Sequence, residues 1–173
     1  KIDLNELSER VTRRLAPNVF RQGGEIAFQA SDKKVWVEGD AVLISEAMDN
    51  LIDNAARYGA ADERLEINIG VVQQDDMAVF FVQDNGAGVV QEDRERIFER
   101  FQRGQEDGSD GCGLGLPIVR EIAELHGGSV RLAETAVGAR FELVFPMALQ
   151  FSSPENQRIM PIAGTAQARP AKA

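Results

Sequence analysis

The sequence predicts an α/β sandwich, in which one mixed, mostly antiparallel sheet is covered on one face by three helices. Three observations support this fold class. Three segments carry apolar residues at helical spacing, several shorter runs are rich in Val, Ile and Phe, and short polar turns join those runs. The chain of 173 residues is 43% hydrophobic, which suffices for one packed domain.

The N-terminal segment predicts one helix followed by two short strands. The helix begins near Asp3, which forms a capping pair with Glu6, and Pro17 is expected to end it. Residues 25–30 and 34–38 then read as strands joined by a polar turn.

The next segment predicts a long helix and two central strands. The helix is capped by Asp40, reaches about Tyr58 and stops near Gly59. Residues 65–73 and 77–83 follow as strands. Because Val, Ile and Phe suit a strand with neighbours on both sides, we place both in the centre of the sheet.

The second half of the chain predicts a short helical stretch, a polar segment, a third helix and a closing hairpin. The polar segment, residues 102–111, is acidic and glycine-containing and lacks apolar periodicity, so we interpret it as a mobile lid. The other elements are the helical stretch 92–101, the helix 116–125 and the hairpin strands 129–134 and 139–145.

Charge and cysteine content exclude several classes of function. The net charge of −9 and the pI near 4.7 argue against nucleic acid as a partner, because phosphate backbones are bound by basic surfaces. A single cysteine, Cys112, excludes an intramolecular disulfide and a zinc site built from thiolates. No apolar run approaches the roughly 20 residues of a membrane-spanning helix.

The long helix carries polar residues that suit a metal-bound nucleotide. Glu46, Asn50 and Asn54 are spaced by four and share one face, which Arg57 and Tyr58 continue. Amide oxygens are hard, neutral ligands for a Mg²⁺ ion that also binds substrate phosphates. Arg57 would pair with a phosphate, and Tyr58 would flank the base or ribose. The alternative is an ordinary amphipathic helix whose polar face meets solvent.

The segment Asp84-Asn85-Gly86-Ala87-Gly88 ends an apolar strand and begins a turn. A carboxylate there can accept a hydrogen bond from the exocyclic amine of adenine. Gly86 and Gly88 would permit a positive φ and close approach of the base. The alternative is a plain strand-ending turn, since Asp-Asn-Gly is common in turns.

A second glycine-rich turn, Gly111-Cys112-Gly113-Leu114-Gly115, immediately precedes the third predicted helix. Such a turn presents backbone N–H groups to an anion, and the helix N-terminus adds its dipole. A dinucleotide fingerprint is excluded because no strand precedes the turn and its glycine spacing differs. We interpret Cys112 as a small filler.

Three charged residues are candidates for the reaction itself. Glu46 is interpreted either as a general base or as support for the water ligands of the metal. Arg100 and Arg103 lie just before the second glycine turn and are candidates to offset charge on a transferred phosphoryl group. The alternative for both arginines is a solvated surface position.

Taken in order, these segments resemble the ATP-binding catalytic domain of sensor histidine kinases, in the GHKL ATPase superfamily. Residues 49–59 resemble its N box, residues 84–88 its G1 box, residues 97–101 its F box and residues 111–116 its G2 box. The resemblance covers roughly residues 1–147, and four ordered motifs make it specific.

The resemblance implies a role for each motif. Asn50 and Asn54 hold Mg²⁺, Arg57 contacts phosphate and Asp84 reads adenine, while Tyr58 lies along the nucleotide. Arg57 stands where many relatives have Lys, which preserves charge but changes donor geometry. The residues assigned to Mg-ATP are Asn50, Asn54, Arg57, Tyr58, Asp84, Gly86, Gly88, Gly111, Gly113, Leu114, Gly115 and Leu116, and those assigned to catalysis are Glu46, Asn50, Arg100 and Arg103.

The resemblance also implies partners. Such kinases transfer the γ-phosphate of ATP to a histidine on a separate dimerisation domain, which passes it to a response regulator. The single histidine, His126, stands at a helix end where the family has a histidine that is not the acceptor. The acceptor domain is therefore expected elsewhere in a longer parent protein, and that parent in the bacterial inner membrane with this part in the cytoplasm.

The implied domain organisation has three parts. Residues 1–16 form a linker helix from the acceptor domain, residues 17–148 the ATP-binding catalytic domain, and residues 149–173 a poorly structured tail. Two alternatives for the function stay open: an ATPase module of the chaperone or topoisomerase kind, with Glu46 as base, and a serine kinase of the anti-sigma type.

Overall fold

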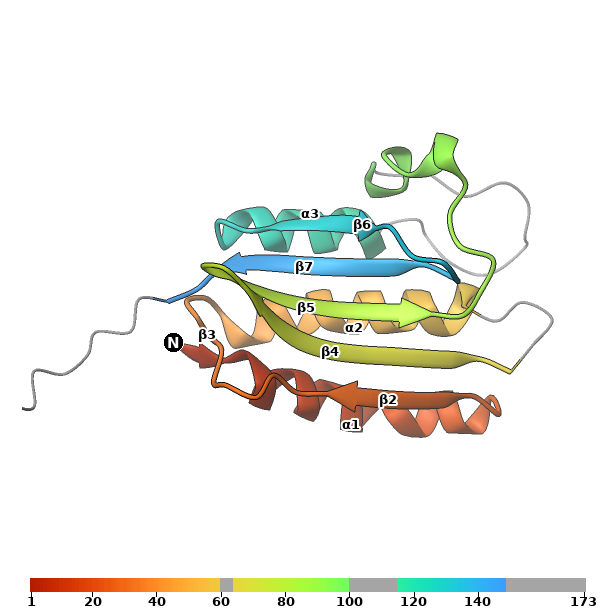
Figure 1. Cartoon of the computed structure of the whole chain (residues 1–173), viewed down its shortest axis with the longest axis horizontal. Coiled ribbons are helices and arrows are strands. Elements are labelled where there is room, and N and C mark those ends of the chain that lie inside the picture. The colour runs from red at the N-terminus through yellow and green to blue at the C-terminus, as the bar shows by residue number, and fades with distance from the viewer. Residues whose placement is uncertain (60–63, 100–114, 149–173) are drawn as a thin grey trace, which may run out of the picture.

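A computed structural model describes residues 1–59, 64–99 and 115–148 of the chain (Figure 1). Two single turns of 3-10 helix, η1 (Gln91–Asp93) and η2 (Arg96–Phe98), supplement the regular elements. In chain order, those elements are β1 (Ile2–Asp3), α1 (Leu4–Arg21), β2 (Glu25–Gln29), β3 (Trp36–Val37), α2 (Ala41–Tyr58), β4 (Glu66–Gln74), β5 (Met77–Asp84), α3 (Gly115–Leu125), β6 (Ser129–Ala133) and β7 (Arg140–Pro146).

The main sheet has the strand order β2-β4-β5-β7-β6. β2 runs parallel to β4, and the other neighbouring strands pair antiparallel. The sheet is therefore mixed and mostly antiparallel, as predicted. β4 and β5, predicted as central strands, both have neighbours on two sides.

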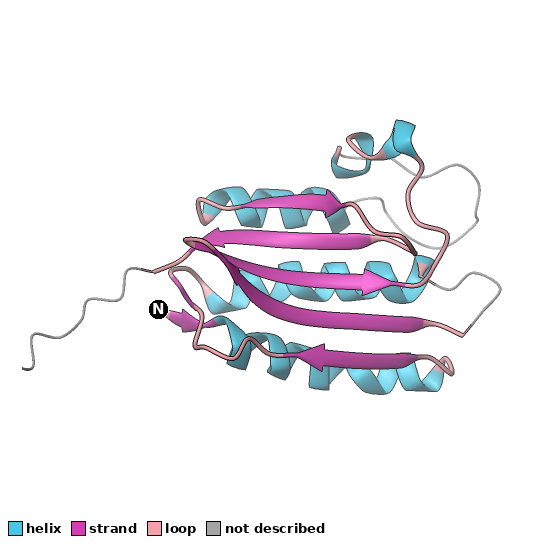
Figure 2. Cartoon of the chain, viewed as in Figure 1, coloured by secondary structure: helices cyan, strands magenta, loops and turns pink. Residues whose placement is uncertain are grey.

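Within the described ranges, the three α-helices cover one face of this sheet, which confirms the predicted sandwich (Figure 2). α2 lies between α1 and α3 and packs against both. Its inward side chains Ile44, Met48 and Leu51 are no more than 1% exposed, and they join Phe80 and Phe141 of the sheet in one core. The helix with the predicted metal ligands is thus the central, best-buried helix of the layer.

Pro17 does not end the first helix, contrary to the prediction. α1 continues for another turn with Pro17 inside it, because Val19 is 1% exposed and packs against Gly24. That burial offsets the backbone hydrogen bond that a proline cannot donate. The helix ends instead where Gly23 adopts a φ of 76° and the N–H of Gly24 donates to the Val19 carbonyl at 3.0 Å. The predicted division between residues 16 and 17 therefore falls within α1.

A small second sheet ties the start of α1 to the end of β7. β1 pairs antiparallel with β3, so the strand predicted over residues 34–38 is reduced to two residues. The N–H of Leu4 donates to Val35 at 2.8 Å, and that of Ala148 donates to Trp36 at 2.8 Å. The first turns of α1 consequently belong to the core, with Leu4 fully buried.

The predicted boundaries of α2 and α3 are confirmed. The Asp40 side chain accepts hydrogen bonds from the N–H groups of Val42 and Leu43, and α2 ends at Tyr58 with Gly59 as its C-cap. α3 ends where Gly127 adopts a φ of 68° and the N–H of Gly128 donates to Ala123.

The segment predicted as a helical stretch over residues 92–101 differs from the prediction. Within its described part it forms the two separate turns η1 and η2. Phe98 anchors η2 by an edge-to-face contact with Phe141, with ring centroids 6.2 Å apart. The predicted lid, residues 102–111, lies outside the described residues. Among the helices that are described, none is long and apolar enough to cross a membrane.

Candidate functional site

The polar face of α2 lies as the spacing predicted. Asn50 and Asn54 are half-buried, whereas Glu46, Arg57 and Tyr58 are exposed, Tyr58 to 57%. Their inward neighbours on the same helix are fully buried, so the orientation of this face is fixed by the core. The helix therefore presents two partly desolvated amides with charged and aromatic side chains on either side.

The amide of Asn50 has a defined orientation. Its nitrogen Nδ2 donates to the backbone carbonyl of Glu46 at 2.9 Å, and since a carbonyl only accepts, the amide oxygen must point the other way. That oxygen, Oδ1, lies 3.2 Å from the position that a Cβ on Gly115 would occupy. The amide oxygen of Asn50 on α2 thus faces Gly115, the first residue of α3, where the second glycine turn ends.

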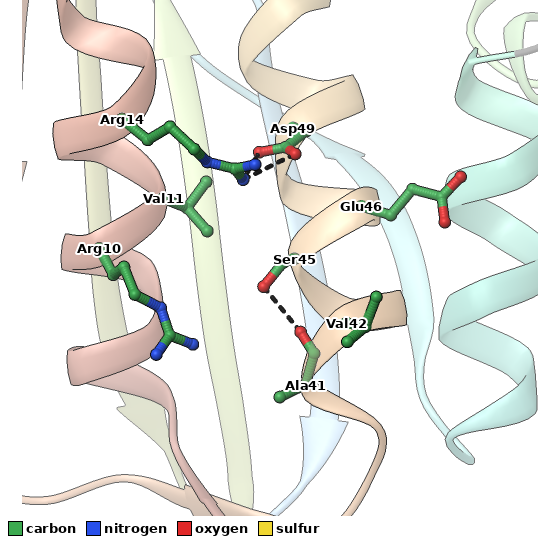
Figure 3. Close-up of a pocket in the computed structure, with 8 residues that line it drawn as sticks. All are labelled: Arg10, Val11, Arg14, Ala41, Val42, Ser45, Glu46 and Asp49. Carbon is green, nitrogen blue, oxygen red and sulfur yellow. Dashed lines mark hydrogen bonds and ion pairs between the residues drawn. The ribbon is translucent and has the colours of Figure 1, made fainter.

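A groove of about 440 Å³ lies between α1 and α2 (Figure 3), and of the predicted site residues that the structure describes, Glu46 alone lines it. Across this groove, Arg14 of α1 donates to both carboxylate oxygens of Asp49 of α2, at 2.7 and 2.8 Å. Burial raises the pKa of Asp49, although the charge of Arg14 opposes that shift. Glu46 itself extends from α2 toward α3, away from α1. Its carboxylate therefore belongs to the side of α2 that Asn50 also faces.

Asp84, the predicted adenine reader, is held in the last position of β5. The residue is 6% exposed, and its oxygen Oδ1 accepts from the N–H groups of Gly86 at 2.9 Å and Ala139 at 3.1 Å. Burial raises the pKa of this carboxyl group, and the two hydrogen bonds oppose the shift. Both bonds go to Oδ1, so the second oxygen, Oδ2, can accept from a ligand.

Glycines make the close backbone packing around Asp84 possible. A methyl group on Gly138 would overlap the Asp84 carbonyl, and one on Gly59 would come within 2.6 Å of the Asp84 Cβ. Gly138 also has a φ of 69°, which other residues adopt only with strain. Gly59, Gly138 and Ala139 were not predicted as parts of this site. The available signal was Gly138, which directly precedes the predicted strand 139–145 in the closing hairpin.

The prediction of a positive φ holds for Gly88 and fails for Gly86. Gly88 has the expected positive φ, 76°, but Gly86 is not among the described residues with a positive φ. A methyl on Gly86 would lie 2.8 Å from the carbonyl oxygen of Tyr58, and one on Gly88 would lie 2.7 Å from that of Gly138. At both glycines the absence of a side chain lets another backbone segment pack closely. Through Gly86, the G1 loop (residues 84–88) packs onto the end of α2.

Asn85 fixes the other side of the same loop. Its Oδ1 accepts from the N–H of Glu66 and its Nδ2 donates to the carbonyl of Arg64, both at 2.8 Å. Arg94 follows this loop in the chain and donates to Glu134 at 2.9 Å and to the Ala133 carbonyl at 3.2 Å. These bonds tie the segment after the loop to the end of β6. The G1 loop is therefore held by side chains as well as by close backbone packing.

Part of the predicted site lies outside the described residues. Of the second glycine turn, the structure describes Gly115 and Leu116, both half-buried in the first turn of α3. The remaining predicted residues are Arg100, Arg103, Gly111, Gly113 and Leu114, and Cys112 lies among them.

The donor set suits the predicted metal. Asn50 offers an amide oxygen oriented toward α3, and Asn54 lies one turn further along the same face. Neutral oxygen ligands of this kind fit a Mg²⁺ ion that keeps water and phosphate oxygens in its remaining positions. The residues present therefore fit the ion.

Comparison with known proteins identifies the family of the chain. Residues 39–149 match the family described as histidine kinase-, DNA gyrase B-, and HSP90-like ATPase. The chain is 36% identical over 143 residues to the sensor protein kinase PmrB of Pseudomonas aeruginosa. It is likewise 36% identical over 135 residues to the signal transduction histidine-protein kinase/phosphatase MprB of Mycolicibacterium vanbaalenii. These alignments cover 82% and 77% of this chain but only 29% and 27% of the two relatives, so the chain spans less than a third of their length.

Solved structures agree with the fold. Full-length ShkA in complex with AMPPNP matches with a TM-score of 0.73 and 30% identity, over 85% of this chain and 30% of that chain. The catalytic domain of the histidine kinase ThkA matches with a TM-score of 0.73 and 26% identity, over 84% of this chain and 93% of that domain. The family match covers more than half of the sequence, and the fold agrees with it. The chain belongs to the histidine kinase-, DNA gyrase B-, and HSP90-like ATPase family.

Proposed function

We propose that this chain is the ATP-binding catalytic part of a two-component sensor histidine kinase. The observation that carries the proposal is the placement of the Asn50 amide oxygen against Gly115, because it joins a metal-ligand helix to the end of a phosphate-binding turn. The similarity to sensor kinases, and the AMPPNP bound in the structure of ShkA, support this reading.

Each end of the nucleotide has its own set of residues in this proposal. Oδ2 of Asp84 accepts the exocyclic amine of adenine, with Tyr58 beside the base or ribose. Asn50 and Asn54 hold Mg²⁺, which when bound neutralises charge on the phosphates. Arg57 donates to a phosphate oxygen.

The remaining predicted residues surround the phosphates. The backbone amides of the second glycine turn cradle the anion together with the N-terminus of α3. Arg100 and Arg103 offset charge on the transferred group, and Glu46 either accepts a proton or orders water around the metal site. The turn residues with this role are Gly111, Gly113, Leu114, Gly115 and Leu116.

The γ-phosphoryl group would pass to a histidine on a helical dimerisation domain of the parent protein, and then to a response regulator. His126 is not the acceptor, since both of its ring nitrogens face backbone groups at a helix end. Residues 1–16 would connect to the acceptor domain, residues 17–148 would form the catalytic domain, and residues 149–173 would form a tail. We place this part of the parent in the cytoplasm and the parent itself in the inner membrane.

The chemical stability of the transferred phosphate tests this proposal. The chain is incubated with γ-labelled Mg-ATP and candidate helical acceptor domains, and the labelled protein is then exposed to acid and to base. We expect label that is lost in acid and kept in base, as for phosphohistidine. Acid-stable label would instead indicate a serine kinase, and steady phosphate release without an acceptor would indicate an ATPase.

A further inference from the structure

His126 joins the C-terminal end of α3 to the N-terminal end of α2. Its Nε2 lies 3.0 Å from the backbone nitrogen of Asp40, and its Nδ1 lies 2.7 Å from the carbonyl oxygen of Ile122. The Asp40 N–H can only donate and the Ile122 carbonyl can only accept. Nε2 must therefore be unprotonated and Nδ1 must carry the proton, so the ring is the neutral Nδ1–H tautomer.

Two further residues pack against the ring. Phe145 of β7 makes an edge-to-face contact with it, with centroids 6.3 Å apart and the planes at 86°. Gly39 also lies close to the imidazole, because a methyl group on it would overlap the ring. A side chain packed this closely fixes the positions of the groups that it bonds.

The two helices are thus joined at two separate places. At one end, His126 just beyond α3 bonds Asp40 just before α2. At the other end, Gly115 at the start of α3 lies against Asn50 on α2. The helices therefore run antiparallel, and the two contacts together define their register. A slip of one helical turn, about 5.4 Å, would separate the end of the glycine turn from the Asn50 amide.

We propose that His126 is a positioning residue that sets the register of α3 against α2, and so the distance between Gly115 and the Asn50 amide. This inference rests on the proposed function. The register acts on the β- and γ-phosphates and on Mg²⁺, whereas adenine is read by Asp84, which is held by β5 and the closing hairpin.

Two variants of similar size test the inference. His126→Asn keeps a donor near the Nδ1 position but has no acceptor at the Nε2 position. His126→Gln can reach the Asp40 N–H with its amide oxygen. We expect Mg-ATP affinity to fall about five- to tenfold in His126→Asn, the value of one lost hydrogen bond, and to stay close to the original chain in His126→Gln. AMP affinity, measured by the same calorimetry, is expected to stay unchanged in both.

Nitrogen NMR provides an independent readout, because the chain has a single histidine. In the neutral form of the ring, we expect the proton on Nδ1. A proton on Nε2, equal Mg-ATP affinity in the two variants, or equal losses for AMP and Mg-ATP would each overturn the inference. Failure of the original chain to bind Mg-ATP would instead overturn the proposed function.

Discussion

The adenine end and the metal face of the proposed site are built differently. At the adenine end, Asp84 is 6% exposed, and its surroundings are mostly main chain, with Gly59 and Gly138 packed against it. At the metal face, Asn50 and Asn54 project from α2 and stay half-buried. The adenine end depends on the course of the backbone at Gly59, Asp84 and Gly138, and the metal face depends on side chains of one helix.

This difference predicts separate consequences of mutation. Where backbone contacts backbone, an added methyl group has no rotamer in which to escape, so the fold itself suffers. Where a side chain projects from a well-anchored helix, its removal leaves the helix in place and affects the ligand alone. Stability and nucleotide affinity should therefore respond differently at the two ends.

The largest effect is expected from Gly138→Ala. The new methyl would overlap the Asp84 carbonyl, and position 138 has a φ of 69°, so clash and backbone strain combine. We expect the free energy of unfolding, measured with urea, to fall by about 3 kcal/mol or more. The matched control is Gly23→Ala, with a φ of 76° and open space around the new methyl, which should cost about 1 kcal/mol. Equal losses in the two variants would contradict the packing argument.

Asn54→Ala tests the metal face. We expect it to lower Mg-dependent ATP affinity about 100-fold, comparable to the loss of a charge-assisted contact, while the unfolding curve stays nearly unchanged. The measurement is calorimetry with and without Mg²⁺. Asp53→Ala, the exposed neighbour on the same helix, serves as the control. Retention of the Mg²⁺-dependent affinity by Asn54→Ala would remove this residue from the metal site.

Asp84→Asn should weaken ATP and ADP binding by about 10- to 100-fold, the range for a hydrogen bond to a charged group. The amide can keep the bonds from Gly86 and Ala139 through its oxygen, so its NH₂ group would replace Oδ2 and face the adenine amine. Asp76→Asn, in the exposed turn between β4 and β5, is the control. Unchanged ADP affinity in Asp84→Asn would refute base reading by this carboxylate.

The same substitution has a predicted pH signature in the nucleotide-free protein. Because the folded pKa of Asp84 is raised above 3.8, the folded state holds its proton longer than the unfolded state. The stability contribution of this group is therefore fully present below pH 3.8 and is lost as the pH rises through the folded pKa. Asp84→Asn lacks this loss, so its stability relative to the original chain should increase with pH across that window. Parallel pH curves from urea unfolding would contradict the assignment.

The smallest effect is expected away from both ends. Arg14→Ala removes the bidentate pair with Asp49, but the arginine is 57% exposed, so the expected loss of stability is about 0.5–1 kcal/mol. Mg-ATP affinity should not change. Arg13→Ala breaks an even more exposed pair with Glu9 on the same helix and should cost less. A loss of nucleotide affinity in Arg14→Ala would mean that the α1–α2 groove is coupled to the site.

Local sequence signals predicted much of the fold because the responsible interactions are local. Asp40 caps α2 through its own N-terminal turn, and Gly127 ends α3 through its own φ. The polar face of α2 was likewise set by spacing alone. Pro17 shows where this reasoning fails, since the burial of Val19 outweighs a local helix-breaking signal.

By itself, the sequence determined the order of the three α-helices and of the main-sheet strands, the polar face of α2 and the candidate ligand residues. These follow from periodicity, capping and residue chemistry within a few positions. Only the tertiary structure decided that β1 pairs with β3, that Gly138 lies against Asp84, and that His126 bonds Asp40. Those contacts join residues far apart in the chain, and their geometry depends on how the helices pack on the sheet.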